Sequence, residues 1–213
     1  LEKKGHEVQK EYYVNDAGRQ IDILTASVYL RAIEIEDNIF PESAYRGEYI
    51  KEIAKNANLQ DAVNIDDLFK SLPEDDEEKI DKIISHLKSA SEKDWKSIKK
   101  VSLESVLSTI EKDLKDFGVT FDNWFLESSL LGADSKIDAA VQQLNTNNLI
   151  DNRDGNIWFK SSDFGDDKDR VLIRADGRQT YFASDVAYHK DKLDRGFDEI
   201  INIWGSDHHG YIK

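Results

Sequence analysis

The stretch that decides the fold runs from Phe164 to Lys213 and reads FGDDKDRVLIRADGRQTYFASDVAYHKDKLDRGFDEIINIWGSDHHGYIK. Its pattern predicts a strand, a turn, a second strand, a helix and a third strand. A polar loop then follows, which holds Asp207, His208 and His209. A helix between apolar strands that leads into such a loop is typical of a nucleotide-type α/β site. The sequence therefore predicts an α/β protein with a Rossmann-type parallel sheet.

Turn and cap residues set the elements within this stretch. The predicted hairpin pairs residues 171–174 with residues 180–183 around a turn at Asp176–Gly177. Ser184 is expected to cap a helix that runs to Arg195 and is ended by Gly196. The apolar run EIINIW, residues 199–204, predicts a buried parallel strand. The preceding GDDKDR, residues 165–170, is interpreted as a solvated charged turn.

The start of the chain shows a second strand-to-helix pattern. Residues 6–14, HEVQKEYYV, predict a strand rich in aromatic and β-branched side chains. The turn NDAG follows, and its Asp16 is expected to cap a helix from Gln20 to about Glu36. This end and the Phe164–Lys213 end are therefore interpreted as two halves of one sheet.

The region between these halves is expected to be entirely helical. Helices are predicted at residues 45–54, 77–90, 102–116 and about 135–145, and the next strand at 156–160. The predicted division is a first Rossmann-half segment at 1–36, a helical insertion at 37–150 and a second Rossmann-half segment at 151–213.

The composition limits the class of protein. The 213 residues are 39% hydrophobic and 34% charged, which allows a core under a heavily solvated surface. No apolar run approaches 18 residues, so no membrane span is predicted. The absence of cysteine excludes disulfides and thiolate metal sites and favours a cytoplasmic location. The net charge of −14 argues against a protein that binds nucleic acid through its overall charge. The absence of methionine, even at position 1, favours an internal fragment.

Tyr181 and Asp185 are the first candidate binding residues. They lie at the end of a predicted strand and the start of the next helix, where α/β folds gather ligand contacts. A carboxylate at this place suits a planar guanidinium, which binds carboxylates through two hydrogen bonds. The alternative interpretation is that Asp185 is only an acidic residue near a helix start and Tyr181 only an aromatic residue of the sheet.

The loop GSDHHGY, residues 205–211, is the second candidate. Asp207, His208 and His209 resemble metal ligands, but consecutive histidines rarely face one ion and no third ligand is evident, so no protein-bound metal is predicted. Gly205 and Gly210 allow a ligand to approach the backbone closely. A loop that contacts a nucleotide and an amino acid is favoured, and a polar surface turn is the alternative.

Two motifs resemble the bacterial arginyl-tRNA synthetases. The motif TYFASDVAYH…RGFD…IINIWGSDHHGY closely resembles the catalytic domain of that class I family, and EYYVNDAGRQI, Glu11–Ile21, resembles the segment that follows its HIGH helix. The two motifs occur in the family's order, about 160 residues apart. The chain is accordingly identified as an internal fragment of such a catalytic domain.

The resemblance implies roles for individual residues. The residues expected to contact the substrate arginine are Tyr181, Asp185 and Asp207. Those expected to contact ATP or the adenylate are Gly205, His208 and His209. The residues expected to border the pocket are Asn15, Asp16, Gly18 and Gln20, although a cap followed by a turn also explains Asp16 and Gly18.

The resemblance also implies the reaction. Arginine and ATP, with Mg²⁺ accompanying the ATP, would give arginyl-adenylate, and the arginyl group would pass to tRNA(Arg). The family's charge-stabilising HIGH and KMSK elements would precede Leu1 and follow Lys213, so no catalytic residue is expected in this chain and the fragment alone is expected to be inactive. The expected partners are arginine, ATP and tRNA(Arg), with no membrane, and the expected state is a monomer.

Two other functions stay open at this point. One is a non-catalytic, acidic helical interaction module that carries an α/β half, which the net charge favours. The other is a class I synthetase for a different amino acid, against which Asp185 argues because its carboxylate suits a cationic substrate.

Overall fold

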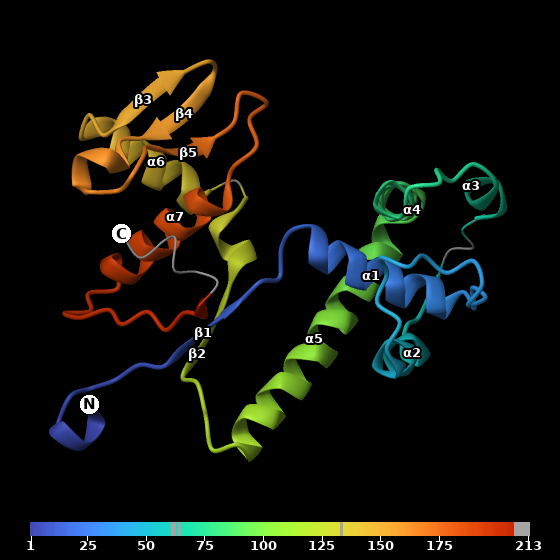
Figure 1. The fold of residues 1–213 in the computed structure, drawn as a ribbon. Helices are drawn as coiled ribbons and strands as arrows, with labels where there is room; N and C mark the ends of the chain where they lie inside the picture. Colours follow the sequence, from blue (N-terminus) through green and yellow to red (C-terminus); the bar gives the residue numbers. More distant parts are fainter. Residues whose placement is uncertain (61–62, 64, 133, 207–213) are drawn as a thin grey trace. The chain divides into compact units, whose positions relative to one another are not determined.

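The computed structural model of the chain describes residues 1–60, 63, 65–132 and 134–206 (Figure 1). Contacts divide it into two compact units, Leu1–Phe125 and Leu126–Lys213. They are called the N-terminal and C-terminal units below, and each is described by itself. The division of this chain into a first Rossmann-half segment (1–36), an insertion (37–150) and a second Rossmann-half segment (151–213) stays a prediction. Among the described residues, no helix is long and apolar enough to cross a membrane.

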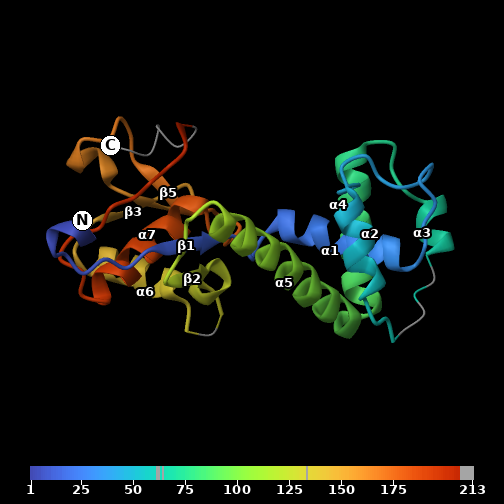
Figure 2. The same ribbon diagram turned by 90° about the horizontal axis from the view of Figure 1, so that it is seen from below.

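A short parallel sheet pairs a strand near the beginning of the N-terminal unit with a strand at its end. Strand β1 (Glu11–Val14) pairs with strand β2 (Asn123–Leu126), and the two labels lie together in both Figure 1 and Figure 2. Aromatic side chains from the two strands pack in pairs, with ring centroids 4.7 Å apart for Tyr12 and Trp124. The prediction that residues 37–150 are entirely helical was wrong at β2, because NWFL carries side chains that favour strands.

Helices build the core of the N-terminal unit. After the short 3-10 helix η1 (Glu2–Lys4), they are α1 (Arg19–Ala32), α2 (Glu48–Lys55), α3 (Asp66–Lys70), α4 (Asp76–Ala90) and α5 (Glu92–Asp116). Helix α1 packs against α2, α4 and α5. The helix predicted at residues 77–90 is confirmed as α4, and its isoleucines and Leu87 are buried.

Helix α5 begins ten residues before its predicted start at residue 102. The side chain of Ser91 caps it by accepting a hydrogen bond of 3.2 Å from the N–H of Asp94. Trp95 and Ile98 in the added turns are buried in the core, which stabilises the longer helix. At the other end Gly118 takes the left-handed backbone expected of a residue that ends a helix, with φ of 85°.

The C-terminal unit combines an antiparallel sheet with two helices. Its elements are η2 (Glu127–Leu130), α6 (Lys136–Thr146), β3 (Ile150–Arg153), β4 (Asn156–Phe159), η3 (Ser161–Phe164), β5 (Arg170–Ile173) and α7 (Tyr181–Asp194). The sheet order is β3-β4-β5, and α6 packs against α7 while both contact the sheet (Figure 1). The two-residue turn Asp154–Gly155 between β3 and β4 has positive φ at both residues, as a tight hairpin requires.

The predicted hairpin at residues 171–183 was wrong in its second half. Strand β5 forms, but its return partner is limited to one bridge, between Ile173 and Gln179. Residues 181–183 instead open α7, and Thr180 rather than Ser184 is the cap. The Thr180 hydroxyl accepts a hydrogen bond of 3.3 Å from the N–H of Ala183. The predicted end of this helix before Gly196 is confirmed, with Gly196 at φ of 81°.

The strand predicted at residues 199–204 does not form in the described structure. The segment has no regular secondary structure, and Ile203 is 93% exposed. A buried parallel strand needs neighbouring strands on both sides, and no described strand pairs with this segment. The mixed α/β class is nevertheless confirmed, with helices and a parallel strand pair in one chain.

Candidate functional site

Helix α7 carries both residues of the first predicted site. Its start is fixed to the end of β5, because the Thr180 hydroxyl donates to the carbonyl oxygen of Val171 at 2.7 Å and the Thr180 N–H donates to the carbonyl oxygen of Leu172 at 2.9 Å. Tyr181 is the first helical residue and Asp185 lies four residues later. One helical turn separates them, so their side chains share a face of α7.

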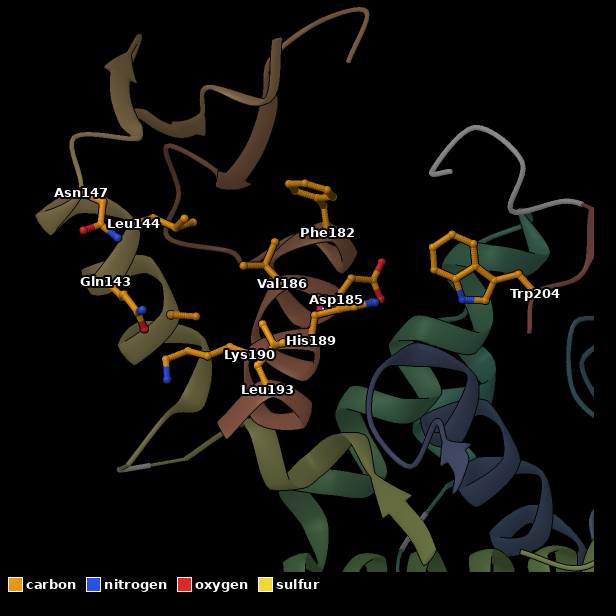
Figure 3. Close-up of a pocket in the computed structure, with 11 residues that line it drawn as sticks. Gln143, Leu144, Asn147, Phe182, Asp185, Val186, His189, Lys190, Leu193 and Trp204 are labelled. Carbon is orange, nitrogen blue, oxygen red and sulfur yellow. The ribbon is translucent and has the colours of Figure 1, made fainter. Parts of the chain in front are cut away.

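A groove of about 380 Å³ between α6 and α7 includes Asp185 (Figure 3). Helix α6 contributes Ala140, Gln143 and Leu144, and Asn147, directly after the helix, lines the same side. Its α7 side contributes Phe182, Asp185, Val186, His189, Lys190 and Leu193, and Trp204 completes the lining. A concave, mostly apolar surface with a few polar groups is the usual form of a small-molecule site. Tyr181 is 75% exposed and is not part of this lining.

His189 is a groove residue that sequence reasoning missed. Its Nδ1 lies 2.8 Å from the carbonyl oxygen of Asp185, and Figure 3 shows the two side chains extending from the same side of α7. A carbonyl oxygen only accepts hydrogen bonds, so Nδ1 carries the proton and Nε2 of the neutral ring is an acceptor. The spacing of four residues from Asp185 on a predicted helix is the signal that could have identified it.

The predicted border residues lie at the junction of β1 and α1 in the N-terminal unit. Gly18 is the N-cap of α1, with φ of 83°, a left-handed conformation that glycine adopts without strain. The prediction that Asp16 caps this helix was wrong, since α1 has no side-chain cap hydrogen bond. Asp16 is instead only 5% exposed, while Asn15 and Gln20 are exposed.

The second predicted site falls mostly beyond the described part of the chain. Gly205 lies in an exposed segment without regular secondary structure. Asp207, His208 and His209 lie outside the described residues. Within residues 1–60, 63, 65–132 and 134–206, no group of three or more histidine, cysteine, aspartate or glutamate side chains is arranged to hold a metal ion.

The charged turn before β5 is more tightly braced than predicted. Asp166 accepts two hydrogen bonds from Arg170, at 2.6 and 2.7 Å, and Asp169 forms an ion pair with Arg153 and accepts hydrogen bonds from Ser162. Arg170 holds the pKa of Asp166 well below its ordinary range. The interpretation as a solvated turn agrees with the exposure of Gly165, Asp167 and Lys168, but the carboxylates of Asp166 and Asp169 are largely covered. The turn therefore braces the strand that leads into α7.

Comparison with known proteins identifies the family. The family model of the catalytic domain of class I (R) tRNA synthetases matches residues 1–213. The chain is 45% identical to the arginine–tRNA ligase of Acinetobacter baylyi, with 100% of this chain and 39% of that protein covered. It is also 45% identical to the arginine–tRNA ligase of Psychrobacter cryohalolentis, where the alignment covers 38% of the relative.

A solved structure agrees in fold. A crystal structure of a protein described as an arginyl-tRNA synthetase from Campylobacter jejuni is 36% identical, with a TM-score of 0.73, and the match covers 98% of this chain and 41% of that chain. The Rossmann-type class I fold predicted from the sequence is consistent with this match. The chain thus spans about 39% of the length of the relatives it matches. With the family model matched from end to end and relatives of this identity, the chain belongs to the catalytic-domain family of the class I arginyl-tRNA synthetases.

Proposed function

We propose that this chain forms part of the substrate-binding region of an arginine–tRNA ligase, which uses ATP to activate arginine and transfers the arginyl group to tRNA(Arg). The relatives at 45% identity carry this name, and the chain spans about 39% of their length. The proposal includes action as a monomer in the cytoplasm, away from membranes. Light scattering and cell fractionation of the complete protein test those two points.

The observation that carries the proposal is Asp185 on α7. This residue is exposed and helps to line a groove of mainly apolar side chains, one helical turn from Tyr181. A carboxylate can accept two parallel hydrogen bonds from a guanidinium, and a phenol can contact the same substrate. We assign the guanidinium of arginine to Asp185 and Tyr181, and propose that Asp207 contacts the same amino acid.

The remaining sequence candidates receive roles in the same scheme. Gly205, His208 and His209 are proposed to contact ATP or the adenylate. The residues proposed to border the pocket are Asn15, Asp16, Gly18 and Gln20. Mg²⁺ would enter with ATP, held mainly by phosphate oxygens and water.

Positioning is the main work of such a site. An oxygen of the arginine carboxylate attacks the α-phosphorus of ATP, the bond to the β-phosphate oxygen breaks, and pyrophosphate leaves with the electron pair. A hydroxyl of the terminal adenosine of tRNA then attacks the activated carbonyl carbon, gives up its proton, and AMP leaves. Holding the reacting atoms at attack distance supplies much of the rate enhancement. Holding the guanidinium at Asp185 fixes where the arginine carboxylate lies.

Replacing Asp185→Asn in the complete protein tests the assignment, because the amide keeps the shape and removes the charge. We expect the KM for arginine to rise roughly 10- to 100-fold, as the loss of a charge-assisted hydrogen bond implies. The KM for ATP should change less than about twofold if this side chain serves arginine alone. Arginine-dependent ATP–pyrophosphate exchange measures both constants.

A matched control is Asp176→Asn, which removes a carboxylate from the exposed turn before α7. It should leave both KM values unchanged. An unaltered KM for arginine in the Asp185→Asn variant contradicts the assignment of the guanidinium to this residue.

A further inference from the structure

His189 is a groove residue to which the proposed binding scheme gives no role. It follows Asp185 by four residues on α7, and both help to line the groove between α6 and α7 (Figure 3). Residues four apart on a helix are neighbours on its surface. The imidazole of His189 therefore lies beside the residue to which the guanidinium of arginine is assigned.

A hydrogen bond to the backbone determines which nitrogen of this ring is available to a ligand. Nδ1 lies 2.8 Å from the carbonyl oxygen of Asp185, so in the neutral ring Nδ1 carries the proton and Nε2 carries the lone pair. Nε2 has no hydrogen-bond partner within the described part of the chain. A half-buried acceptor that no protein donor satisfies is available to a donor on a ligand in the groove.

The charged groups around His189 favour a cation beside its ring. Of the residues that line the groove, Asp185 and Lys190 carry charge, and Lys190 forms an ion pair with Asp194 further along α7. Helix α6 contributes only uncharged side chains to the groove, while β5 and η2, which also pack against α7, contribute none. The ring of Tyr188 packs edge-on to His189, and a phenol is ordinarily uncharged near neutral pH. A ligand next to His189 therefore meets the Asp185 carboxylate and a neutral acceptor.

We propose that His189 is a further binding residue for the arginine side chain, whose Nε2 accepts a hydrogen bond from the guanidinium held by Asp185. This inference rests on the proposed function. A guanidinium has five N–H donors, and the two that a carboxylate accepts leave others for a neighbouring acceptor. Protonation of the ring, which histidines undergo between pH 8 and pH 5, replaces this acceptor with a positively charged donor. Arginine binding should therefore weaken as the pH falls through this range, and binding should release a proton.

Titration calorimetry of arginine with the complete protein tests the inference without ATP or tRNA. We expect the Kd for arginine to rise roughly 3- to 10-fold from pH 8 to pH 6, because a proton taken up by histidine in this range must leave before arginine binds. Carboxylates are ordinarily ionised throughout this range, so they do not produce the effect. Proton release is measured directly, as the dependence of the binding heat on the ionisation enthalpy of the buffer.

Two variants separate the acceptor from the shape of the ring. His189→Phe keeps a planar ring and removes the acceptor, so the Kd for arginine at pH 8 should rise roughly tenfold, the scale of a hydrogen bond to a charged group. His189→Gln supplies an amide oxygen that accepts but does not titrate, so its Kd should rise less than about threefold and binding should release no proton. A purely structural need for a ring would give the opposite order. His6→Gln, at an exposed histidine near the start of the chain, is the matched control and should keep the pH dependence.

The outcomes separate this inference from the proposed function. Arginine binding that does not change between pH 8 and pH 6 in the unaltered protein overturns the inference alone, and this measurement needs no variant to fold. Proton release that persists in His189→Gln, or a His189→Phe variant that binds arginine as tightly as the unaltered protein, also contradicts it. A folded, unaltered protein that neither binds arginine nor shows arginine-dependent ATP–pyrophosphate exchange overturns the proposed function and this inference with it.

Discussion

Single carboxylates in this chain serve different purposes according to what surrounds them. Asp185 lies in a groove, while Asp166 accepts two hydrogen bonds from Arg170 in the turn before β5. Asp166 occurs in the charged turn GDDKDR, whereas Asp185 occurs in the less charged stretch TYFASDVAYH at the start of α7. The Asp166 pair is a structural brace, because it joins residues four apart within one turn and holds the start of the strand that precedes α7.

Asp166→Asn should make stability less dependent on pH. Arg170 lowers the pKa of Asp166 in the folded state below the ordinary value of about 3.9. A lowered pKa contributes stability that is complete above the ordinary pKa and is lost as the pH falls toward the folded value. The unaltered protein should therefore exceed the variant in urea unfolding midpoint at pH 7, and the difference should shrink below about pH 4. A difference that stays constant down to pH 3 contradicts the assigned role, and Asp163→Asn, in the neighbouring η3, is the control.

At the scale of secondary-structure elements, the sequence correctly predicted the helices and strands whose formation depends mainly on neighbouring residues. Helices α4 and α6, strand β4 and the glycine end of α7 follow from apolar spacing and turn residues, and all are confirmed. Asp185 was likewise predicted to lie near the start of a helix, whereas Tyr181 was predicted in the preceding strand and is the first residue of α7. His189 was missed because its place in the groove depends on α6, which is distant in sequence.

The predictions that were wrong concern segments whose secondary structure depends on contacts with residues distant in sequence. YFAS at residues 181–184 suits either a strand end or a helix start, and both Thr180 and Ser184 are acceptable caps. The hydrogen bond from the Thr180 hydroxyl to the carbonyl oxygen of Val171 favours the earlier start, and the sequence does not reveal that contact. The segment 199–204 has the composition of a strand, but a strand also needs partners that its own residues cannot supply.

Thr180→Ala tests the cap that fixes the start of α7. Loss of the hydroxyl removes its hydrogen bonds to Ala183 and Val171, and such caps typically contribute about 1 kcal/mol. We expect the free energy of unfolding, measured by urea titration, to fall by about this amount. Thr180→Ser keeps the hydroxyl and should lose much less. Equal stability of the alanine and serine variants contradicts the role given to this cap.

At the scale of the whole molecule, the chain belongs to a family whose members are longer. It spans about 39% of the length of its relatives and carries a net charge of −14. Acidic protein repels the phosphates of tRNA, so we expect the complete protein to bind tRNA mainly through other parts. The exposed apolar residues Ile201, Ile203 and Trp204 are consistent with a segment that pairs with a strand in the complete fold.

Arginine-dependent ATP–pyrophosphate exchange by the complete protein, run with and without tRNA, tests the central claim most directly. The account predicts exchange that requires arginine and is not supported by lysine or glutamate, and none from residues 1–213 alone. A requirement for tRNA would add that tRNA assembles the active site. A folded complete protein that shows no exchange under either condition contradicts the account and favours a non-catalytic interaction module.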